Sequence, residues 1–255
     1  MKTFLFTLVI MSSLSAIAQS NAYSILNETS EAVNSHRSIA YTAKKTFKGC
    51  DRPDTMFSYG DVSLLRVQSD SEFGGMIYLA PYDNTYTFYD LDKVYSIDKY
   101  NATAKVLDNP ELIRQVKKGK KYVQVKEIAP HKTLGSNFMR TSLVWDDFLK
   151  PSEFQDYIKT CKVKRLDDTI INSERCYEVC AKHLPSMEQM DDHETTTIYY
   201  ISKETGIPIF TRHWYKNGGT YEYSEFLLLN YELDSVHKSR FSKEQIPSFY
   251  TIRDK

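Results

Sequence analysis

The chain has 255 residues, of which 33 are basic and 33 acidic, so its formal net charge is zero. This balance argues against a general nucleic-acid-binding protein, because such a protein needs excess positive charge to displace the counterions of the phosphate backbone. Tyrosine is frequent, with 19 residues, and glycine is scarce, with 9, a composition that favours extended strands over helices and linkers.

Residues 1–18 have the pattern of a secretory signal peptide. The second residue is basic, an apolar stretch runs from Phe4 to Leu14, and Ala16 and Ala18 form a small-x-small cleavage pattern. The apolar stretch is too short for a permanent membrane anchor. We therefore expect a cleaved, exported protein, either periplasmic or secreted, with a single mature domain over residues 19–255.

Four cysteines follow the predicted cleavage site: Cys50, Cys161, Cys176 and Cys180. An even number of cysteines permits disulfides in an oxidising compartment, and four cysteines allow three connectivities, which the sequence leaves open. There is no Cys-x-x-Cys motif, so neither a thioredoxin-type redox site nor a zinc knuckle is indicated.

The first predicted element is a helix from Ala22 to Val33, where apolar residues recur three and four positions apart. Alternation then predicts a strand over 38–48, in which Ile39, Tyr41, Ala43 and the polar Lys45 share one face. Two more strands are expected over 61–68 and 73–80. Asp and Asn residues divide the segment 85–107 into two or three antiparallel strands.

Two helical regions are predicted in the middle of the chain. A short helix is expected to start at Pro110 and end before Gly119. A second region spans Thr141 to Thr160, with a kink expected at Lys150-Pro151. One side of this region is crowded with apolar residues, namely Leu143, Val144, Trp145, Phe148 and Leu149.

After Cys161 the chain is again predicted to be extended. Segments 162–171 and 174–183 form a hairpin about Asn172-Ser173, a polar loop spans 184–193, and a meander occupies 194–234. Helices are few and never alternate regularly with strands. This order predicts an α+β fold, in which helices are segregated to one face of an antiparallel sheet.

The meander contains Asn217-Gly218, the strongest short hairpin signal, because a type I′ turn needs positive φ at both positions. A two-residue loop there would pair Trp214 with Tyr221. A three-residue loop would instead pair Phe210 with Phe226. The sequence leaves this register open, and a slip of one residue moves side chains to the other face.

The strand after this turn, 220–233, carries apolar residues on both of its faces. One face carries Tyr221, Tyr223, Leu227, Leu229, Tyr231 and Leu233, and the other carries Phe226 and Leu228 among polar residues. A face this apolar needs a cover. The helical segment with Trp145 and Phe148 is the obvious candidate.

Several motifs resemble the C-terminal signature of the LolA-like superfamily, the family of outer-membrane lipoprotein carriers. They are Thr205-Gly206-Ile207-Pro208 before a strand, then Asn217-Gly218-Gly219, and a long strand ending Leu229-Asn230-Tyr231-Glu232-Leu233. The tail over 241–250, and the N-terminal helix leading into Ile39-Ala40-Tyr41, also resemble that family.

The resemblance implies a half-barrel, a strongly curved antiparallel sheet around a few helices, with an apolar concavity that binds acyl chains. It implies an exported, non-enzymatic carrier or chaperone for a hydrophobic small molecule, a lipid or a lipoprotein acyl chain. Such a carrier would be a monomer and would have no cofactor. It would touch membranes only transiently. The expected lining combines Trp145 and Phe148 with Phe210, Trp214, Phe226 and Leu228, or with the alternative set Tyr221, Tyr223 and Leu227.

Residues capable of catalysis or metal binding are scattered. The densest group, 191–194, is interpreted as a solvated turn rather than a metal site. His213 and Glu222 are a candidate cross-strand pair. The basic run 117–121 could touch lipid head groups, although a solvated helix end is the simpler interpretation. Two alternatives to a carrier therefore stay open: a hydrolase using carboxylates of 191–194, and an interaction module whose concavity is filled by its own side chains.

Overall fold

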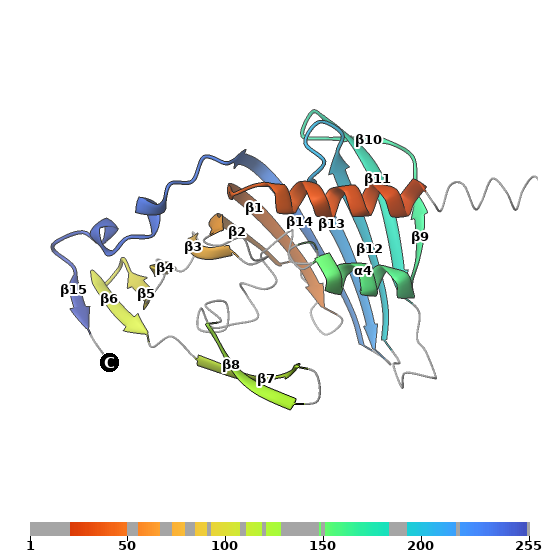
Figure 1. Ribbon diagram of the computed structural model, residues 1–255. Helices are drawn as coiled ribbons and strands as arrows, with labels where there is room; N and C mark the ends of the chain where they lie inside the picture. The colour runs from red at the N-terminus through yellow and green to blue at the C-terminus, as the bar shows by residue number, and fades with distance from the viewer. Residues whose placement is uncertain are drawn as a thin grey trace, which may run out of the picture. The chain divides into compact units, whose positions relative to one another are not determined.

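The computed structural model describes residues 21–49, 56–66, 73–79, 85–90, 93–107, 111–118, 121–128, 148, 151–183, 193–217 and 220–253 (Figure 1). The predicted signal peptide and Trp145 lie outside these ranges. Within them the chain forms antiparallel strands and two α-helices, one over residues 21–35 and α4 over Pro151–Thr160. Neither of these two helices is long and apolar enough to cross a membrane.

The strands are β1 Ser38–Gly49, β2 Met56–Arg66, β3 Phe73–Leu79, β4 Thr85–Asp90, β5 Lys93–Asp98, β6 Thr103–Leu107, β7 Glu111–Lys118, β8 Lys121–Ile128, β9 Cys161–Arg165, β10 Thr169–Ile171, β11 Glu174–His183, β12 His193–Ser202, β13 Pro208–Asn217, β14 Thr220–Leu233 and β15 Thr251–Arg253. The main sheet has the order β10-β11-β12-β13-β14-β1-β2-β3-β4-β5-β6-β15, with β9 beside β11. It does not close on itself, which confirms the predicted α+β antiparallel sheet. The final pair, β6 and β15, is parallel.

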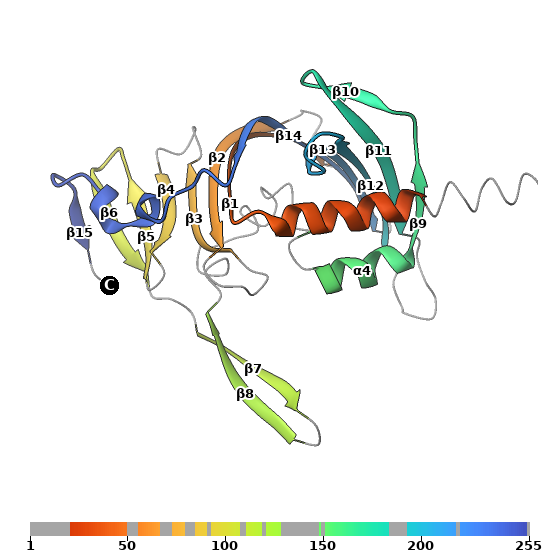
Figure 2. The ribbon, with the colours of Figure 1, turned by 45° about the horizontal axis from the view of Figure 1, so that its top comes forward.

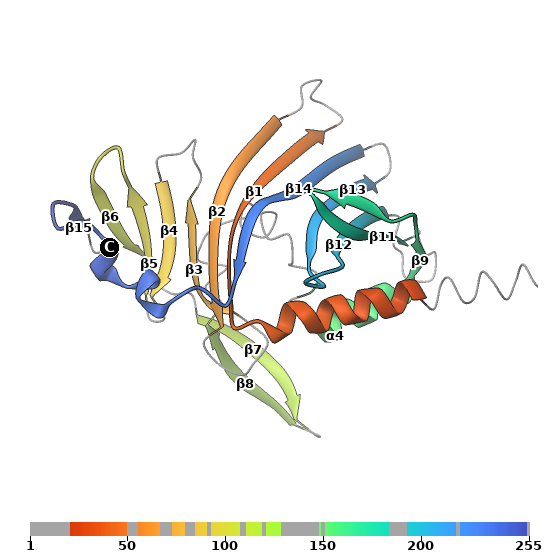
Figure 3. The same cartoon turned by 90° about the horizontal axis from the view of Figure 1, so that it is seen from above.

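The described residues fall into two compact units. The first lies within 1–36, 44–57 and 144–229, and the second within 37–43, 58–143 and 230–255. In the first unit, β11, β12, β13 and β14 curve around the N-terminal helix and α4 (Figures 2 and 3). This is the curved sheet with helices on its concave face that the resemblance implies. A single domain over 19–255 stays a prediction.

The helix predicted from Pro110 to Gly119 is wrong. Residues 111–118 and 121–128 form the hairpin β7–β8, in which Lys118 lies opposite Lys121 and Val116 opposite Val123. Two residues therefore connect the strands. The β-branched residues of both segments favour strands over helix, so Gly119 follows a strand and not a helix.

The N-terminal helix packs in the first unit through the face that its periodicity predicts. Ala22, Ile25, Leu26 and Val33 are buried. Thr29, on the same face, is also buried and donates its hydroxyl hydrogen to the Ile25 carbonyl at 2.8 Å, which satisfies a polar group that is out of contact with water. Amphipathic packing therefore explains this helix better than propensity alone.

The turn between β10 and β11 confirms the predicted hairpin about Asn172-Ser173. Both residues have positive φ, 49° and 70°, and Ile171 lies opposite Glu174. A two-residue turn with positive φ at both positions matches the right-handed twist of the flanking strands. The Asn172 side-chain amide also donates to the Leu228 carbonyl at 2.7 Å, which ties the hairpin tip to β14.

Among the described residues of the second unit, apolar side chains form two small clusters. In one, Tyr95, Ile97, Ala104 and Ile246 are packed together with Val106 and Tyr250. In the other, Val236 and Phe241 pack with Ala40, and Phe241 ends the short 3-10 helix η1, Lys238–Phe241. The chain after β14 therefore packs back onto β1, β5 and β6 through apolar residues, and β15 then pairs with β6.

Candidate functional site

The β13–β14 hairpin has a register that neither expectation anticipated. Asn217 lies opposite Thr220 and Trp214 opposite Tyr223, so residues 218 and 219 form the connection. The turn is thus one position later than the Asn217-Gly218 signal indicated. Ring contact between Trp214 and Tyr223, with centroids 5.1 Å apart, supports this pairing.

The observed register separates residues that were expected to share a lining. Phe226 lies opposite Thr211, and Leu228 shares its face of β14. Phe210 and Trp214 lie on the other face. That face also carries the alternative set Tyr221, Tyr223 and Leu227. The predicted combination of Phe210 and Trp214 with Phe226 and Leu228 is therefore wrong, because the register differs by one residue and side chains alternate.

The helices identify which face of the sheet is the inner one. The Phe148 ring contacts Tyr199 of β12 edge-on at 5.2 Å and Phe154 of α4 at 4.5 Å. On α4, the Tyr157 hydroxyl lies 3.1 Å from the Thr195 hydroxyl. Tyr199 and Thr195 share one face of β12, and we call this face, continued across β11, β13 and β14, the inner face.

Strand pairing arranges the inner face into three rows. The first row is Val179, Tyr199, Thr211 and Phe226. The second row is Ala181, Thr197, His213 and Ser224. The third row is His183, Thr195, Tyr215 and Glu222. Along the strands the inner face therefore changes from mainly apolar to mainly polar.

The polar rows are hydrogen-bonded. Thr197 Oγ1 lies 2.9 Å from His213 Nδ1, and Thr160 Oγ1 of α4 lies 3.1 Å from His183 Nδ1. His213 lies opposite Ser224, so the expected cross-strand pair with Glu222 is wrong. Glu222 lies opposite Tyr215, a consequence of the same shift in register.

Burial varies over the inner face. Val179, Thr197, Tyr199, Thr211 and Leu228 are buried, and Phe148, which contacts Tyr199, is fully buried. On β13 and β14, His213 and Phe226 are only partly buried. The structure thus places Phe148, Phe226 and Leu228 on the helix side of the sheet, with Phe226 in its less covered part.

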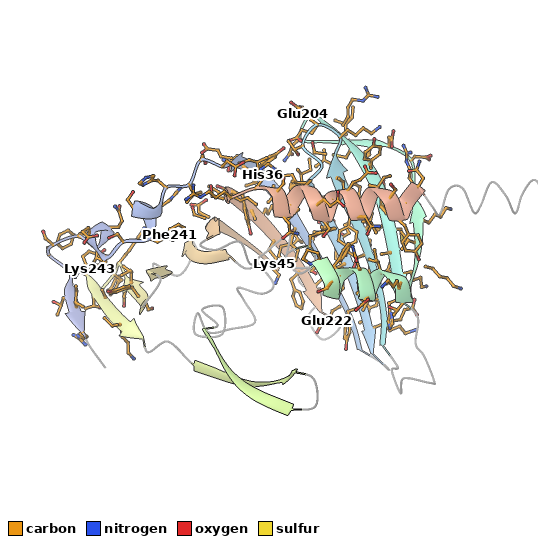
Figure 4. The ribbon with its side chains drawn as sticks, viewed as in Figure 1. His36, Lys45, Glu204, Glu222, Phe241 and Lys243 are labelled. Carbon is orange, nitrogen blue, oxygen red and sulfur yellow. The ribbon has the colours of Figure 1, made fainter. Side chains whose placement is uncertain are left out.

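Lys45 lies beside Phe226 and was not among the residues that the sequence singled out as lining. Its Nζ lies 5.1 Å from the centroid of the Phe226 ring, a cation–π arrangement. Burial lowers the pKa of Lys45 from 10.5 to about 8. The negative charge of Glu222 acts in the opposite direction and raises this pKa. Figure 4 labels both residues, Lys45 on β1 and Glu222 on β14. The signal available was its place in the alternation of Ile39, Tyr41 and Ala43.

The opposite, outer face of the meander carries a cluster built around Arg212. Its guanidinium lies over the rings of Tyr200 and Phe210, at 5.5 and 5.1 Å, and those rings stack at 4.9 Å. Arg212 also donates to the Tyr200 hydroxyl at 3.1 Å and to Glu225 at 3.0 Å. Phe210 therefore packs in an aromatic and ionic cluster on the outer face, away from the helices.

The acidic segment 191–194 lies only partly within the described chain. Glu194 pairs with Lys182 at 2.7 Å, and this cation lowers the pKa of the carboxyl. Among the described residues, no three His, Cys, Asp or Glu side chains gather in a way that could hold a metal ion. Glu194 is thus a strand residue with a cross-strand partner.

The thiols of the first unit lie on both faces of the sheet. Cys176 is buried and Cys180 is partly buried, and both are in the free thiol form. Burial raises the pKa of Cys176 to about 11. The Cys161 thiol donates a hydrogen bond to the Tyr157 carbonyl, with Sγ 3.4 Å from the oxygen. Cys50 lies outside the described residues.

No protein-family model and no curated protein matches the chain. Similar solved structures include lipoprotein LppX of Mycobacterium tuberculosis, at 7% identity and TM-score 0.44, covering 86% of this chain and 97% of that one. They also include a LolA superfamily protein of Nitrosomonas europaea, at 10% identity and TM-score 0.34, covering 88% and 98%. A DUF1329 family protein of Desulfovibrio piger has 8% identity and TM-score 0.39, covering 90% and 99%.

Proposed function

We propose that the protein is an exported, non-enzymatic carrier or chaperone that holds a lipid-like or lipidated ligand against the inner face of the first unit. The observation that carries this proposal is the partly buried Phe226, which lies on the helix side of the sheet with its ring 5.1 Å from the Nζ of Lys45. Apolar surface of this kind, next to a few polar groups, is typical of small-molecule sites.

The energy available from such a site is sufficient for capture. Burying about ten methylenes at roughly 0.8 kcal/mol each would contribute about 8 kcal/mol before the costs of ordering the chain and the protein. Part of that cost would be the displacement of side chains already in place. The ligand therefore gains most at the partly buried residues of the inner face, Phe226 among them.

A second candidate function is an interaction module whose concavity is filled by its own side chains. It is favoured by the burial of the inner face, where Phe148, Tyr199 and Leu228 are fully or almost fully buried. In this case the helices would stay closed over the sheet. The protein would then act through its outer surface.

Uptake of a hydrophobic fluorescent dye by the purified protein, with displacement by a fatty acid, separates the two candidates. The carrier is expected to bind the dye, and Phe226→Ser is expected to weaken uptake at least fivefold. Tyr221→Ser is the matched control, because Tyr221 is 48% exposed and lies on the outer face. Failure of the wild-type protein to bind dye, together with a native mass free of lipid, would favour the self-filled module.

A further inference from the structure

We propose that the protein docks on the surface of an anionic lipid membrane through one end of the sheet in the second unit, the end at which β6 and β15 begin. Two exposed aromatic residues, Tyr100 and Phe249, would enter the head-group region. Two cations, Lys105 and Arg253, would attract the anionic head groups. This inference concerns the second unit alone and does not depend on the ligand proposed for the inner face of the first.

The first step is the position of two turns. Residues 99–102 form the turn before β6, and residues 247–250 form the turn before β15. The two strands are parallel, with Thr251 opposite Thr103, so both turns lie at the same end of the sheet (Figure 1). The backbone N–H of Thr251 donates to the Ala102 carbonyl at 3.0 Å, which joins one turn to the other.

Each turn is anchored and presents an aromatic side chain to solvent. In the first turn, Asp98 accepts hydrogen bonds from the Asn101 backbone N–H at 3.0 Å and from its side-chain amide at 2.6 Å. The second turn is held by Tyr250, which packs against the core cluster of the unit and meets the Phe249 ring edge-on at 4.9 Å. The exposure of Tyr100 and Phe249 is therefore a feature of two bonded, packed turns.

The shape of this end of the sheet favours a membrane over a protein partner. Tyr100 is 84% exposed and Phe249 is 75% exposed, the two highest values for large apolar side chains of the described residues. Side chains this exposed project from the surface and do not line a groove. A protein partner would need a matching pocket for each ring, whereas the head-group region adapts to protruding rings and is where tyrosine side chains gather.

The charge beside the turns favours anionic lipid. Lys105 on β6 lies opposite Arg253 on β15, and both side chains are exposed. Like charges directly opposite each other destabilise a sheet, and an anionic surface would offset that repulsion. Lys105 is two residues from the start of β6, about 7 Å along the strand. This is within the Debye length of about 10 Å at 0.1 M salt, so both cations would act on a membrane that the turns touch.

The test measures sedimentation of the purified protein with vesicles of phosphatidylcholine alone and with vesicles that also contain phosphatidylglycerol. We expect at least tenfold tighter binding to the anionic vesicles at low salt, and loss of this preference at high salt. Tyr100→Ser and Phe249→Ser are each expected to weaken binding at least threefold. The double variant Lys105→Gln, Arg253→Gln is expected to bind both kinds of vesicle equally weakly.

The matched controls lie in the first unit. Ile170→Ser removes an apolar side chain that is 67% exposed on β10, and Lys164→Gln removes an exposed cation on β9. Neither change is expected to alter vesicle binding. Circular dichroism of each variant confirms that the comparison is made between folded proteins.

Three outcomes would overturn the proposal. They are wild-type protein that sediments with neither kind of vesicle, equal binding of the wild-type protein to both kinds, and controls that lose as much binding as the turn variants. The first would leave the two rings to a protein partner. Dye uptake keeps the two proposals apart, because Phe226→Ser is expected to weaken dye uptake and bind vesicles normally, whereas Tyr100→Ser is expected to do the reverse.

Discussion

Gly206 lies against the N-terminal helix so closely that a Cβ added to it would be 3.1 Å from the Cβ of Ala32. Its φ is +73°, in the left-handed region that side chains with a Cβ rarely adopt. The Thr205-Gly206 turn between β12 and β13 is therefore a packing contact as well as a connection. Glycine is required there for two separate reasons, backbone conformation and space.

We expect Gly206→Ala to lower the free energy of unfolding by about 2 kcal/mol, from the left-handed backbone and the tight contact together. Urea denaturation measures the effect. Ala32→Gly in the same protein should recover only the part due to crowding, so a double-mutant cycle separates the two contributions. A Gly206→Ala variant as stable as wild type would contradict the packing described here.

The Arg212 cluster predicts a second stability effect. Arg212→Ala removes a guanidinium packed over two rings and bonded to Tyr200 and Glu225, and we expect a loss of about 1 kcal/mol. Arg212→Lys should recover less than half of this, because an ammonium group cannot reproduce the planar contacts. Complete recovery with lysine would show that charge alone matters at this position.

Elements with a single strong local signal were predicted correctly. The spacing of Ala22, Ile25, Leu26 and Val33 is sufficient to define the buried face of the N-terminal helix. The Asn172-Ser173 turn was also anticipated, since asparagine tolerates positive φ. In both cases the structure is determined by residues that are close together in the sequence, so it can be predicted from the sequence alone.

Features that depend on pairing between strands were not predicted. The β7–β8 hairpin was mistaken for a helix because Pro110 and Gly119 also suit helix ends. In the β13–β14 hairpin, the Asn217-Gly218 motif predicted a turn one position too early. There the ring contact of Trp214 with Tyr223 and the ion pair of Arg212 with Glu225 accompany a register that the turn residues alone do not specify.

The faces of the residues named as lining were predicted only in part for the same reason. Phe148, Phe226 and Leu228 lie on the helix side of the sheet, whereas Phe210 and Trp214 lie on the other side. That any of them binds a ligand stays a prediction. Which face a strand residue occupies is set by register. The sequence shows Lys45 as a polar residue in an otherwise apolar alternation. Its contact is with Phe226, which is about 180 residues away in the chain, so local pattern could not predict it.

The buried thiols give a prediction about reactivity. Burial raises the pKa of Cys176 to about 11, so at pH 8 its reactive thiolate is scarce as well as covered. We expect alkylation of Cys176 in the native protein to be more than tenfold slower than in denatured protein. Cys180, which is less buried, is the internal comparison and should react faster in the native state. Peptide mapping after timed iodoacetamide treatment measures both rates, and a Cys176 that reacts as fast in the native protein would contradict its burial.

The last prediction concerns the pH dependence of stability at Lys45. Its pKa is lowered from 10.5 to about 8 in the folded protein. The unfolded chain therefore binds more protons than the folded one between pH 8 and 10.5, and in that range this group makes stability rise with pH. Below pH 8 the group is charged in both states and destabilises the fold. We expect this cost to be about 1 kcal/mol once the part of the side chain still in water is discounted.

Lys45→Met should accordingly be more stable than wild type at pH 7 by about 1 kcal/mol, with the difference shrinking toward zero as the pH approaches 10. Glu222 on β14 is the charged group that raises the pKa of Lys45, and it is unchanged in the variant. Urea denaturation of both proteins across this pH range measures it, with Lys48→Met as the control that should show no such trend. A stability difference that stays constant from pH 7 to 10 would contradict the desolvation of Lys45 in the folded protein.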